Sequence, residues 1–254
     1  MIENKITVIL NGYKRPENLQ EQLDAINNQT VKPETTLLWY NYPGEDFEVN
    51  YDVSSQIPTS LNNHNYGVWA RFAFALNVDT EYICVFDDDT IPGSKWFENC
   101  LNTMKTHEGL LCTVGALYTI PATPERSSYF EHYIRFGWPH NNTQVQEVDW
   151  SGHAWFFKRE WLSAFWRELP NPIYKTCGED MHFSYMLQKY LGLKTYVPPH
   201  PPTDKEMWGS LKGSEYGGKN SLWGLGKPQH DLTNQYFKEQ RLKGWKLVNE
   251  SEWK

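Results

Sequence analysis

Three consecutive aspartates follow an apolar run in this sequence of 254 residues. Residues 82–86 are aromatic, β-branched or otherwise apolar, which predicts a buried strand, and a Pro-Gly pair just after the acids indicates the turn that leaves it. Asp87, Asp88 and Asp89 are therefore expected at the carboxyl end of a central strand, where open α/β sheets bind their ligands. Neighbouring carboxylates repel one another unless a cation neutralises them, and such hard oxygen ligands suit Mg²⁺ or Mn²⁺. The alternative for an isolated acidic triplet is a solvated turn.

The start of the chain predicts a βαβ unit. Residues 5–10 form an apolar strand, the polar loop 11–15 follows, and apolar side chains recur at helical spacing over 16–28. A second strand is predicted over 35–40. A unit of this kind gives a parallel sheet with a right-handed crossover.

The next segments complete a predicted nucleotide-binding half over residues 1–95. A short strand is expected at 54–58, and an alanine-rich helix at 68–77 precedes the acidic strand. Loops that follow parallel strands meet at one edge of the sheet, which is the usual ligand site of such a fold. The loops concerned are 11–15, 41–44 and 87–89.

The composition is that of a soluble globular protein, with 39% hydrophobic and 22% charged residues. Aromatic residues make up 15%. Because amphipathic rings stack on sugars and nucleobases, this excess favours a carbohydrate or nucleotide ligand, with a large aromatic core as the alternative. The net charge of −7 argues against nucleic acid as a partner, since phosphate backbones need a basic surface.

The cysteines and the first residues of the sequence indicate the cellular compartment of the protein. The cysteines show no zinc-ligand spacing, so reduced thiols are expected. Residues 1–5 lack the features of a signal peptide, and no stretch approaches 18 apolar residues, so neither secretion nor a transmembrane segment is expected. These observations predict a cytoplasmic protein. The cysteines are Cys84, Cys100, Cys112 and Cys177.

Four segments in order resemble one family of enzymes. Residues 7–29 read as a strand followed by Tyr-x-Arg, residues 65–76 contain Asn-x-Gly and then Ala-Arg, and residues 82–93 hold the acidic strand. Residues 176–180 open a predicted helix with a Glu-Asp pair. Together they resemble the metal-dependent GT-A glycosyltransferases, closest to the family-2-like group, and the cysteine before the Glu-Asp pair also resembles exostosin-type GT-A enzymes. The resemblance covers most of residues 5–195.

The resemblance implies an α/β protein with the GT-A fold, in which helices flank a mostly parallel central sheet. It implies a single domain over 1–254, with the nucleotide-binding half at 1–95, an acceptor and catalytic half at 96–197, and a lid with a C-terminal helix at 198–254. The implied donor is a UDP- or GDP-sugar. The implied acceptor is a glycan or another compound with a hydroxyl group.

A metal site follows from the same resemblance. It implies that Asp89 ligates Mn²⁺ or Mg²⁺ with Asp87 beside it, and that Asp87 and Asp88 contact ribose, sugar hydroxyls or metal-bound water. His200 is expected as an additional ligand from the later part of the chain, with a histidine in a proline-rich turn as the alternative.

The resemblance also places side chains at the nucleotide. Tyr13, Arg15 and Asn41 correspond to base and ribose contacts. Asn65 and Arg71 would fix the base or a donor phosphate. A structural ion pair with one of the aspartates is the alternative for Arg71, and a packing ring is the alternative for Tyr13. Completing the set, Gly12 would allow the backbone to approach the donor closely.

Glu179 and Asp180 begin the predicted helix, where a carboxylate is stabilised as an anion. The resemblance implies that Asp180 is the general base, which removes the proton of the attacking acceptor hydroxyl, and that Glu179 orients the acceptor or the sugar. A helix N-cap pair is the alternative. If the exostosin likeness holds instead, the reaction retains anomeric configuration and Asp180 stabilises the donor side.

The second half predicts a strand over 110–118 and, over 148–157, a polar Ser-Gly-His turn followed by a strand. The resemblance places this latter segment along the cleft for sugar and acceptor. There Trp150 would stack on the acceptor sugar and residues 151–153 would approach the donor sugar. For His153 the alternative is a hydrogen-bonded core histidine.

The last part of the chain predicts a lid. Residues 198–205 are proline-rich and residues 209–220 are glycine-rich, which is typical of a segment that closes over a bound ligand. A final helix is predicted over 231–243. Candidate phosphate contacts in this region are Lys205, Lys212 and Lys219.

The sequence therefore favours a metal-dependent, inverting glycosyltransferase. A retaining enzyme is one alternative. Nucleotidyl transfer is another, but the loop 11–15 lacks the glycine-rich run and paired basic residues expected for it. A non-catalytic carbohydrate- or Ca²⁺-binding module would account for the acids and aromatics, but not for the Glu-Asp helix.

Overall fold

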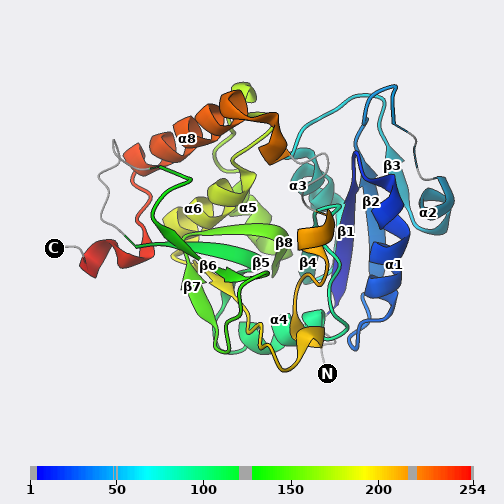
Figure 1. The fold of residues 1–254 in the computed structure, drawn as a ribbon, viewed down its shortest axis with the longest axis horizontal. Helices are drawn as coiled ribbons and strands as arrows, with labels where there is room; N and C mark the ends of the chain where they lie inside the picture. Colours follow the sequence, from blue (N-terminus) through cyan, green and yellow to red (C-terminus); the bar gives the residue numbers. More distant parts are fainter. Residues whose placement is uncertain (1–4, 48, 50, 120–127, 217–221, 253–254) are drawn as a thin grey trace.

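The computed structural model describes residues 5–47, 49, 51–119, 128–216 and 222–252. At its centre is a nine-stranded sheet in the order β3-β2-β1-β4-β8-β5-β9-β7, with β6 paired to β5. Figure 1 shows the first half of the chain (blue and cyan) on one side of the molecule and the second half on the other. The strands are β1 (Ile6–Gly12), β2 (Thr35–Tyr40), β3 (Thr59–Leu61), β4 (Tyr82–Phe86), β5 (Gly109–Tyr118), β6 (Tyr133–Gly137), β7 (Gln146–Val148), β8 (Trp150–Lys158) and β9 (Lys194–Val197).

The strand directions divide the sheet into two parts. Strands β1 to β4 pair in parallel, and β8 then runs antiparallel between β4 and β5. Strands β1 to β5 and β9 run in one direction, whereas β6, β7 and β8 run in the other. The fold class is therefore the predicted one, a mixed α/β architecture with a mostly parallel sheet.

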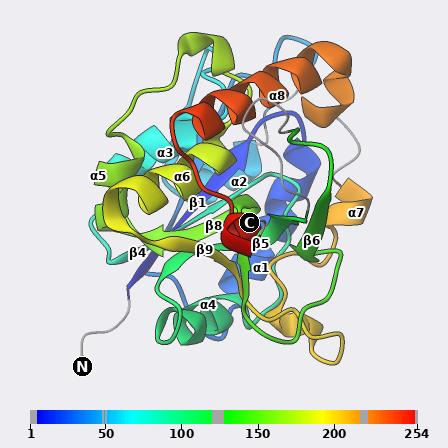
Figure 2. The ribbon, with the colours of Figure 1, turned by 90° about the vertical axis from the view of Figure 1, so that its left-hand side faces the viewer.

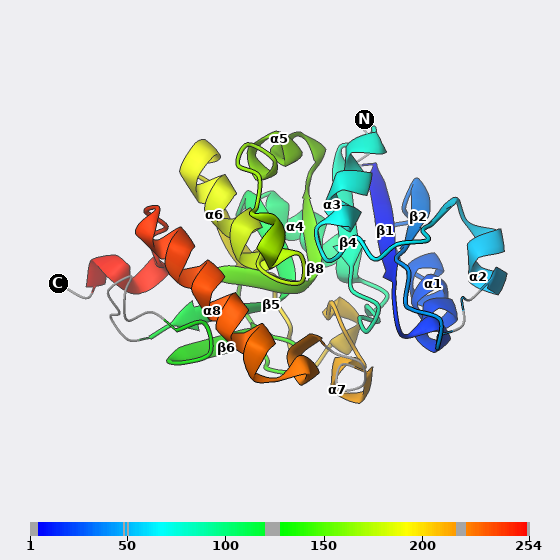
Figure 3. The same ribbon diagram turned by 90° about the horizontal axis from the view of Figure 1, so that it is seen from above.

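Helices cover both faces of this sheet. Helix α4 (Trp96–Met104) lies on one face of the second half and α6 (Glu179–Leu191) on the other, with α8 (Lys227–Leu242) over α6 (Figure 2). Helices α1 (Leu19–Asn27) and α3 (Ala70–Phe74) lie on opposite sides of β1 (Figure 3). None of the helices in the described ranges is long and apolar enough to cross a membrane. The shorter helices are α2 (Tyr51–Gln56), α5 (Leu162–Phe165) and α7 (Gly213–Tyr216).

The predicted βαβ unit is confirmed. Strands β1 and β2 are parallel with Ile9 opposite Leu37, and α1 connects them after one turn of 3₁₀-helix. Helix α1 buries Leu19, Leu23 and Ile26, which are the residues that gave the helical spacing. Local periodicity is sufficient here because one face of the helix packs on the sheet.

Other predicted elements differ from the structure. The strand expected at 54–58 is wrong, because residues 51–56 form α2 and the strand β3 follows it. Pro58 disfavours helical backbone at the residue before it, so the helix ends and the strand begins around this position. The helix expected at 68–77 is α3 followed by one 3₁₀ turn. The final helix begins at Lys227 and not at 231.

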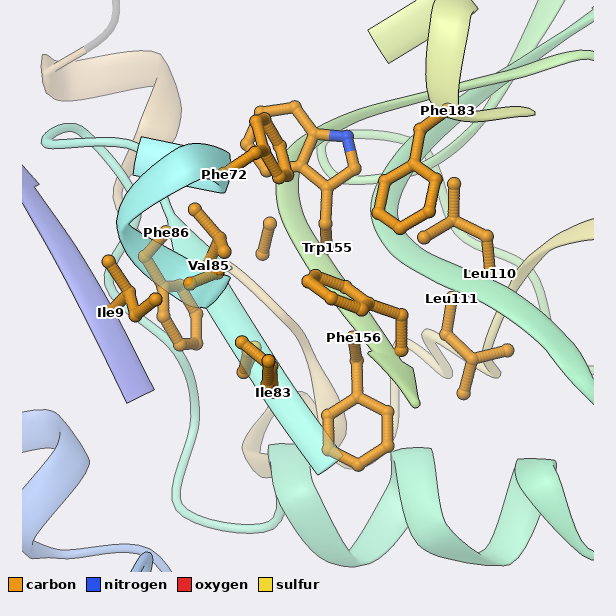
Figure 4. Packing of buried hydrophobic residues seen from close by; sticks show 14 of the residues in the cluster. Ile9, Phe72, Ile83, Val85, Phe86, Leu110, Leu111, Trp155, Phe156 and Phe183 are labelled. Carbon is orange, nitrogen blue, oxygen red and sulfur yellow. The ribbon is translucent and has the colours of Figure 1, made fainter. Parts of the chain in front are cut away.

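The core accounts for many of the aromatic residues. Figure 4 shows Ile83 and Val85 of β4 packed beside Phe156 and Trp155 of β8. The ring of Phe72 meets that of Trp155 edge to face at 5.4 Å between centroids. Pairs of this geometry add to the stabilisation from burial. The large-core interpretation of the aromatic content therefore applies to these rings.

Candidate functional site

The carboxyl ends of β1, β2 and β4 meet at a cavity of about 230 Å³, here called the first cavity. The three strands are parallel neighbours, so the loops that follow them converge at one edge, as predicted. Most of the predicted donor and metal residues meet in this cavity. Its lining includes Tyr13, Arg15, Asn41, Asn65, Arg71, Asp87, Asp88, Asp89 and Glu179.

Two buried arginines pair with the acids of the first cavity. Arg15 places Nη1 at 2.5 Å from Oδ1 of Asp88 and 3.5 Å from Oδ2 of Asp89. Arg71 pairs with Asp87 through Nη1. In this structure Arg71 therefore makes the ion pair with one of the aspartates that was the alternative interpretation of this residue. Charge-assisted hydrogen bonds of this kind fix the carboxylates in place.

A candidate metal centre is formed by Asp87, Asp89 and His153. Each offers one ligand atom, and these atoms lie within 4.8 Å of one another. Nδ1 of His153 is 3.4 Å from Oδ1 of Asp89, is sealed from solvent, and makes no hydrogen bond to any described residue. Two carboxylates and one imidazole nitrogen without a hydrogen-bond partner are a donor set that fits a divalent cation such as Mn²⁺.

The pairing of β8 with β4 places His153 in this centre. Its backbone oxygen accepts hydrogen bonds from the N–H of Asp87 at 2.9 Å and from Oγ1 of Thr90 at 3.1 Å. Its φ angle is +65°, a left-handed conformation that non-glycine residues seldom adopt and that is concentrated at functional sites. Residues 151–153 lie inside β8 and not in a turn before it, so the predicted turn is wrong.

Burial and charge act on the acids in opposite directions. Burial by itself raises the pKa of Asp89, but His153 and Arg15 favour the carboxylate more strongly and the pKa is lowered. Burial raises the pKa of Glu179, against the attraction of Arg71. The metal-centre carboxylate Asp89 is therefore held as an anion, whereas Glu179 is biased toward its neutral form.

A hydrogen-bonded chain of polar side chains forms another wall of the first cavity. Nδ2 of Asn41 donates to Oδ1 of Asn65 at 3.0 Å, and Nδ2 of Asn65 donates to the hydroxyl of Tyr13 at 2.9 Å. Oδ1 of Asn41 accepts the N–H of Tyr66 at 2.9 Å. These bonds fix the two amides and the phenol in the wall of the first cavity.

Gly12 packs closely against a buried ring. It is absent from the lining of the first cavity, and a Cβ atom there would lie 3.0 Å from the ring of Tyr40. Its missing side chain makes room for that buried ring, and a close approach of the donor to this backbone stays a prediction.

Asp180 lies in a second cavity of about 140 Å³, which shares Val68, Thr176 and Glu179 with the first. Its Oδ1 accepts the N–H of Met181 at 2.7 Å. Burial raises the pKa of Asp180, although this N–H bond opposes the shift. The predicted metal site and the predicted base are thus in adjoining cavities.

The start of α6 depends on Gly178. This residue has φ +95°, and a Cβ atom on it would lie 2.7 Å from Cδ1 of Tyr236. Only glycine combines that backbone angle with so close an approach of a ring. The turn delivers Glu179 and Asp180 to the two cavities.

The structure does not support His200 as a metal ligand. The side chain is fully buried, Nδ1 lies 2.8 Å from the carbonyl oxygen of Pro198, and Nε2 accepts the N–H of Gly209 at 3.1 Å. With both nitrogens engaged in neutral hydrogen bonds, no lone pair is available for a cation. Burial lowers the pKa of His200 to about 4. The prediction is corrected to a structural histidine.

Trp150 and the lysines of the C-terminal part are also engaged elsewhere. Trp150 is 3% exposed and stacks on Tyr129, so the core and not an acceptor contacts its ring. Lys212 pairs with Glu21 at 2.5 Å. Lys205 lies over the ring of Trp208. Lys219 lies outside the described residues.

Comparisons with known proteins show the fold. No family model matches the sequence, and no curated protein matches it. Among solved structures, TarS of S. aureus superposes with a TM-score of 0.50 at 14% identity, covering 77% of this chain and 36% of that one. TarS 1–349 in complex with UDP-GlcNAc gives a TM-score of 0.50 at 12% identity, covering 80% and 60%. The chain therefore shares the fold of TarS, and it spans between about a third and three-fifths of the compared chains.

Proposed function

We propose that this protein is a metal-dependent glycosyltransferase of the family-2-like GT-A type, which transfers a sugar from a nucleotide-diphosphate sugar to an acceptor hydroxyl. The observation that carries the proposal is the pair of adjoining cavities, one with Asp87, Asp89 and His153 and the other with Asp180. The fold shared with TarS, whose structure holds UDP-GlcNAc, supports the same conclusion.

The first cavity is proposed to bind the donor. Asp87, Asp89 and His153 would hold Mn²⁺ or Mg²⁺, and the bound ion would supply Lewis-acid neutralisation of the diphosphate as the glycosidic bond breaks. Tyr13 would offer its hydroxyl proton to base or ribose, and Asn65, held by Asn41, already orients that hydroxyl by donating to it. A side chain that is oriented before binding loses less entropy when the ligand arrives.

The second cavity is proposed to bind the acceptor. Asp180 would take the proton from the acceptor hydroxyl while that oxygen attacks the anomeric carbon from the face opposite the diphosphate. Asp180 lines the second cavity and is absent from the lining of the first, which favours a base in an inverting reaction over a stabiliser on the donor side. Glu179 lines both cavities, so it is placed to orient the acceptor beside the sugar.

An assay of product release tests the function. The full chain is incubated with UDP- and GDP-sugars, Mn²⁺ and a panel of glycan acceptors, and nucleoside diphosphate is measured with and without EDTA. A glycosyltransferase releases UDP or GDP only with the metal, and faster with an acceptor. Release of pyrophosphate would indicate nucleotidyl transfer. Donor binding without any release would indicate a binding module.

A further inference from the structure

Tyr129 contacts the proposed base from a distant part of the chain. Its hydroxyl donates a hydrogen bond of 3.0 Å to Oδ2 of Asp180. The other carboxylate oxygen accepts the N–H of Met181 at 2.7 Å. Each oxygen of the carboxylate therefore has one fixed donor, and the carboxylate cannot rotate without breaking both bonds. Tyr129 also lines the second cavity beside Asp180.

Three elements hold the backbone and the ring of Tyr129. Its backbone N–H donates to Oδ1 of Asn234 on α8 at 2.8 Å, and its backbone carbonyl oxygen accepts the hydroxyl of Tyr118 on β5 at 3.0 Å. The ring stacks on Trp150 of β8, with centroids 4.9 Å apart and planes 25° apart. Packing and hydrogen bonds of this kind restrict a side chain to one rotamer.

We propose that Tyr129 is a positioning residue, which fixes the carboxylate of Asp180 in the orientation that accepts the acceptor's proton. This inference rests on the proposed function of Asp180. Tyr129 would donate one hydrogen bond throughout the reaction and would not exchange its own proton with substrate. Burial, together with the charge of Asp180, raises the pKa of Tyr129 well above its usual value, so the phenol stays protonated and remains a donor.

The groups around Asp180 determine how its pKa changes when the Tyr129 hydroxyl is removed. Burial raises the pKa of Asp180, whereas the Met181 N–H and the Tyr129 hydroxyl lower it by stabilising the anion. Removing the hydroxyl therefore shifts the carboxyl toward its protonated, inactive form. The other titratable or charged side chains that face it or act on it are Arg71, Asp87, Tyr118, Cys177, Glu179, His230 and Tyr236.

The test is Tyr129→Phe, which keeps the stacked ring and removes only the hydroxyl. We expect turnover to fall about tenfold to a hundredfold, as for loss of a hydrogen bond to a charged group. The acidic limb of the pH–rate profile should move to higher pH, while KM for the donor stays unchanged. Tyr185→Phe is the matched control, because it removes the hydroxyl of another buried tyrosine of α6, one that donates to the carbonyl oxygen of Lys243 and not to Asp180.

A second measurement does not depend on turnover. The carboxyl of Asp180 is titrated by ¹³C NMR in the full chain without substrate, with Asp180→Asn used for assignment. A higher pKa in Tyr129→Phe than in the wild type supports the inference even if no donor is found, whereas failure of every donor counts against the proposed function alone. An unchanged carboxyl pKa, or a pH–rate profile that does not move, would overturn the inference.

Discussion

Arg71 donates a hydrogen bond of 2.8 Å from Nη2 to Oε1 of Glu179, and both residues are buried. Arg71 belongs to α3 in the first half of the chain, and Glu179 is the first residue of α6 in the second. The same guanidinium also pairs with Asp87. One cation therefore joins the proposed donor acids to the wall shared by the two cavities.

Replacing this cation should destabilise the fold. Arg71→Met leaves the carboxylates of Asp87 and Glu179 without their partner, and we expect a loss of about 3–5 kcal/mol in the free energy of unfolding. Urea denaturation measures it. Arg71→Lys should lose less, because it retains one positive charge but not the two-pronged geometry. A change of under about 1 kcal/mol in Arg71→Met would show that the pairing contributes little.

The metal centre can be tested without an activity assay. Asp89→Asn and His153→Ala should each weaken Mn²⁺ binding in the presence of UDP. The loss should exceed the roughly 10–100-fold that is typical when a residue that only hydrogen-bonds to a metal ligand is replaced. Titration followed by electron paramagnetic resonance measures free Mn²⁺. Asp204→Asn, which alters a half-buried acid paired with Lys95, is the control. Equal Mn²⁺ affinity in all three variants would contradict the proposed ligands.

His200 should affect stability and not metal binding. His200→Ala leaves the Gly209 N–H unpaired and a cavity beside Trp96, so we expect a loss of about 2–5 kcal/mol with unchanged Mn²⁺ affinity. A marked loss of Mn²⁺ affinity in a folded His200→Ala protein would restore His200 as a ligand.

The same histidine predicts a pH dependence of stability. Its pKa is lowered to about 4 in the folded state, from about 6.5 in an unfolded chain. The stability that comes from keeping His200 neutral is therefore fully present above pH 6.5. It is lost as the pH falls toward 4, because the unfolded state binds the proton first. His182, with a pKa lowered to about 4, adds to the same slope. Urea denaturation at several pH values measures this effect. The free energy of unfolding should fall less steeply with decreasing pH in a His200→Phe variant than in the wild type.

Asp180 should control transfer but not donor binding. Asp180→Asn removes the proton acceptor while keeping the side-chain shape, and transfer should fall about 10²–10⁴-fold. Donor affinity, measured by calorimetry with Mn²⁺, should be close to that of the wild type. Since burial raises the pKa of Asp180, wild-type turnover should decline as the pH falls through that raised value. Near-normal transfer by the Asn variant would rule out the base.

Local signals in the sequence determined the acidic end of β4 and the helices around it. The run 82–86 is buried on both faces, so a strand that ends just before Asp87 followed without long-range information. The spacing in α1 and the Glu-Asp start of α6 were equally local. A resemblance in four ordered segments then gave the fold. The family-2-like assignment and the division at residues 95 and 197 remain predictions.

Only the tertiary structure decided which side chains meet those acids. His153 reaches Asp89 because β8 pairs antiparallel with β4, and Tyr129 reaches Asp180 across a separation of 51 residues. His200 was misassigned because sequence shows a histidine's type but not whether its nitrogens are already bonded. Periodicity reports which residues are buried, whereas a ligand set depends on strand pairing between segments far apart in the chain, which no local pattern encodes.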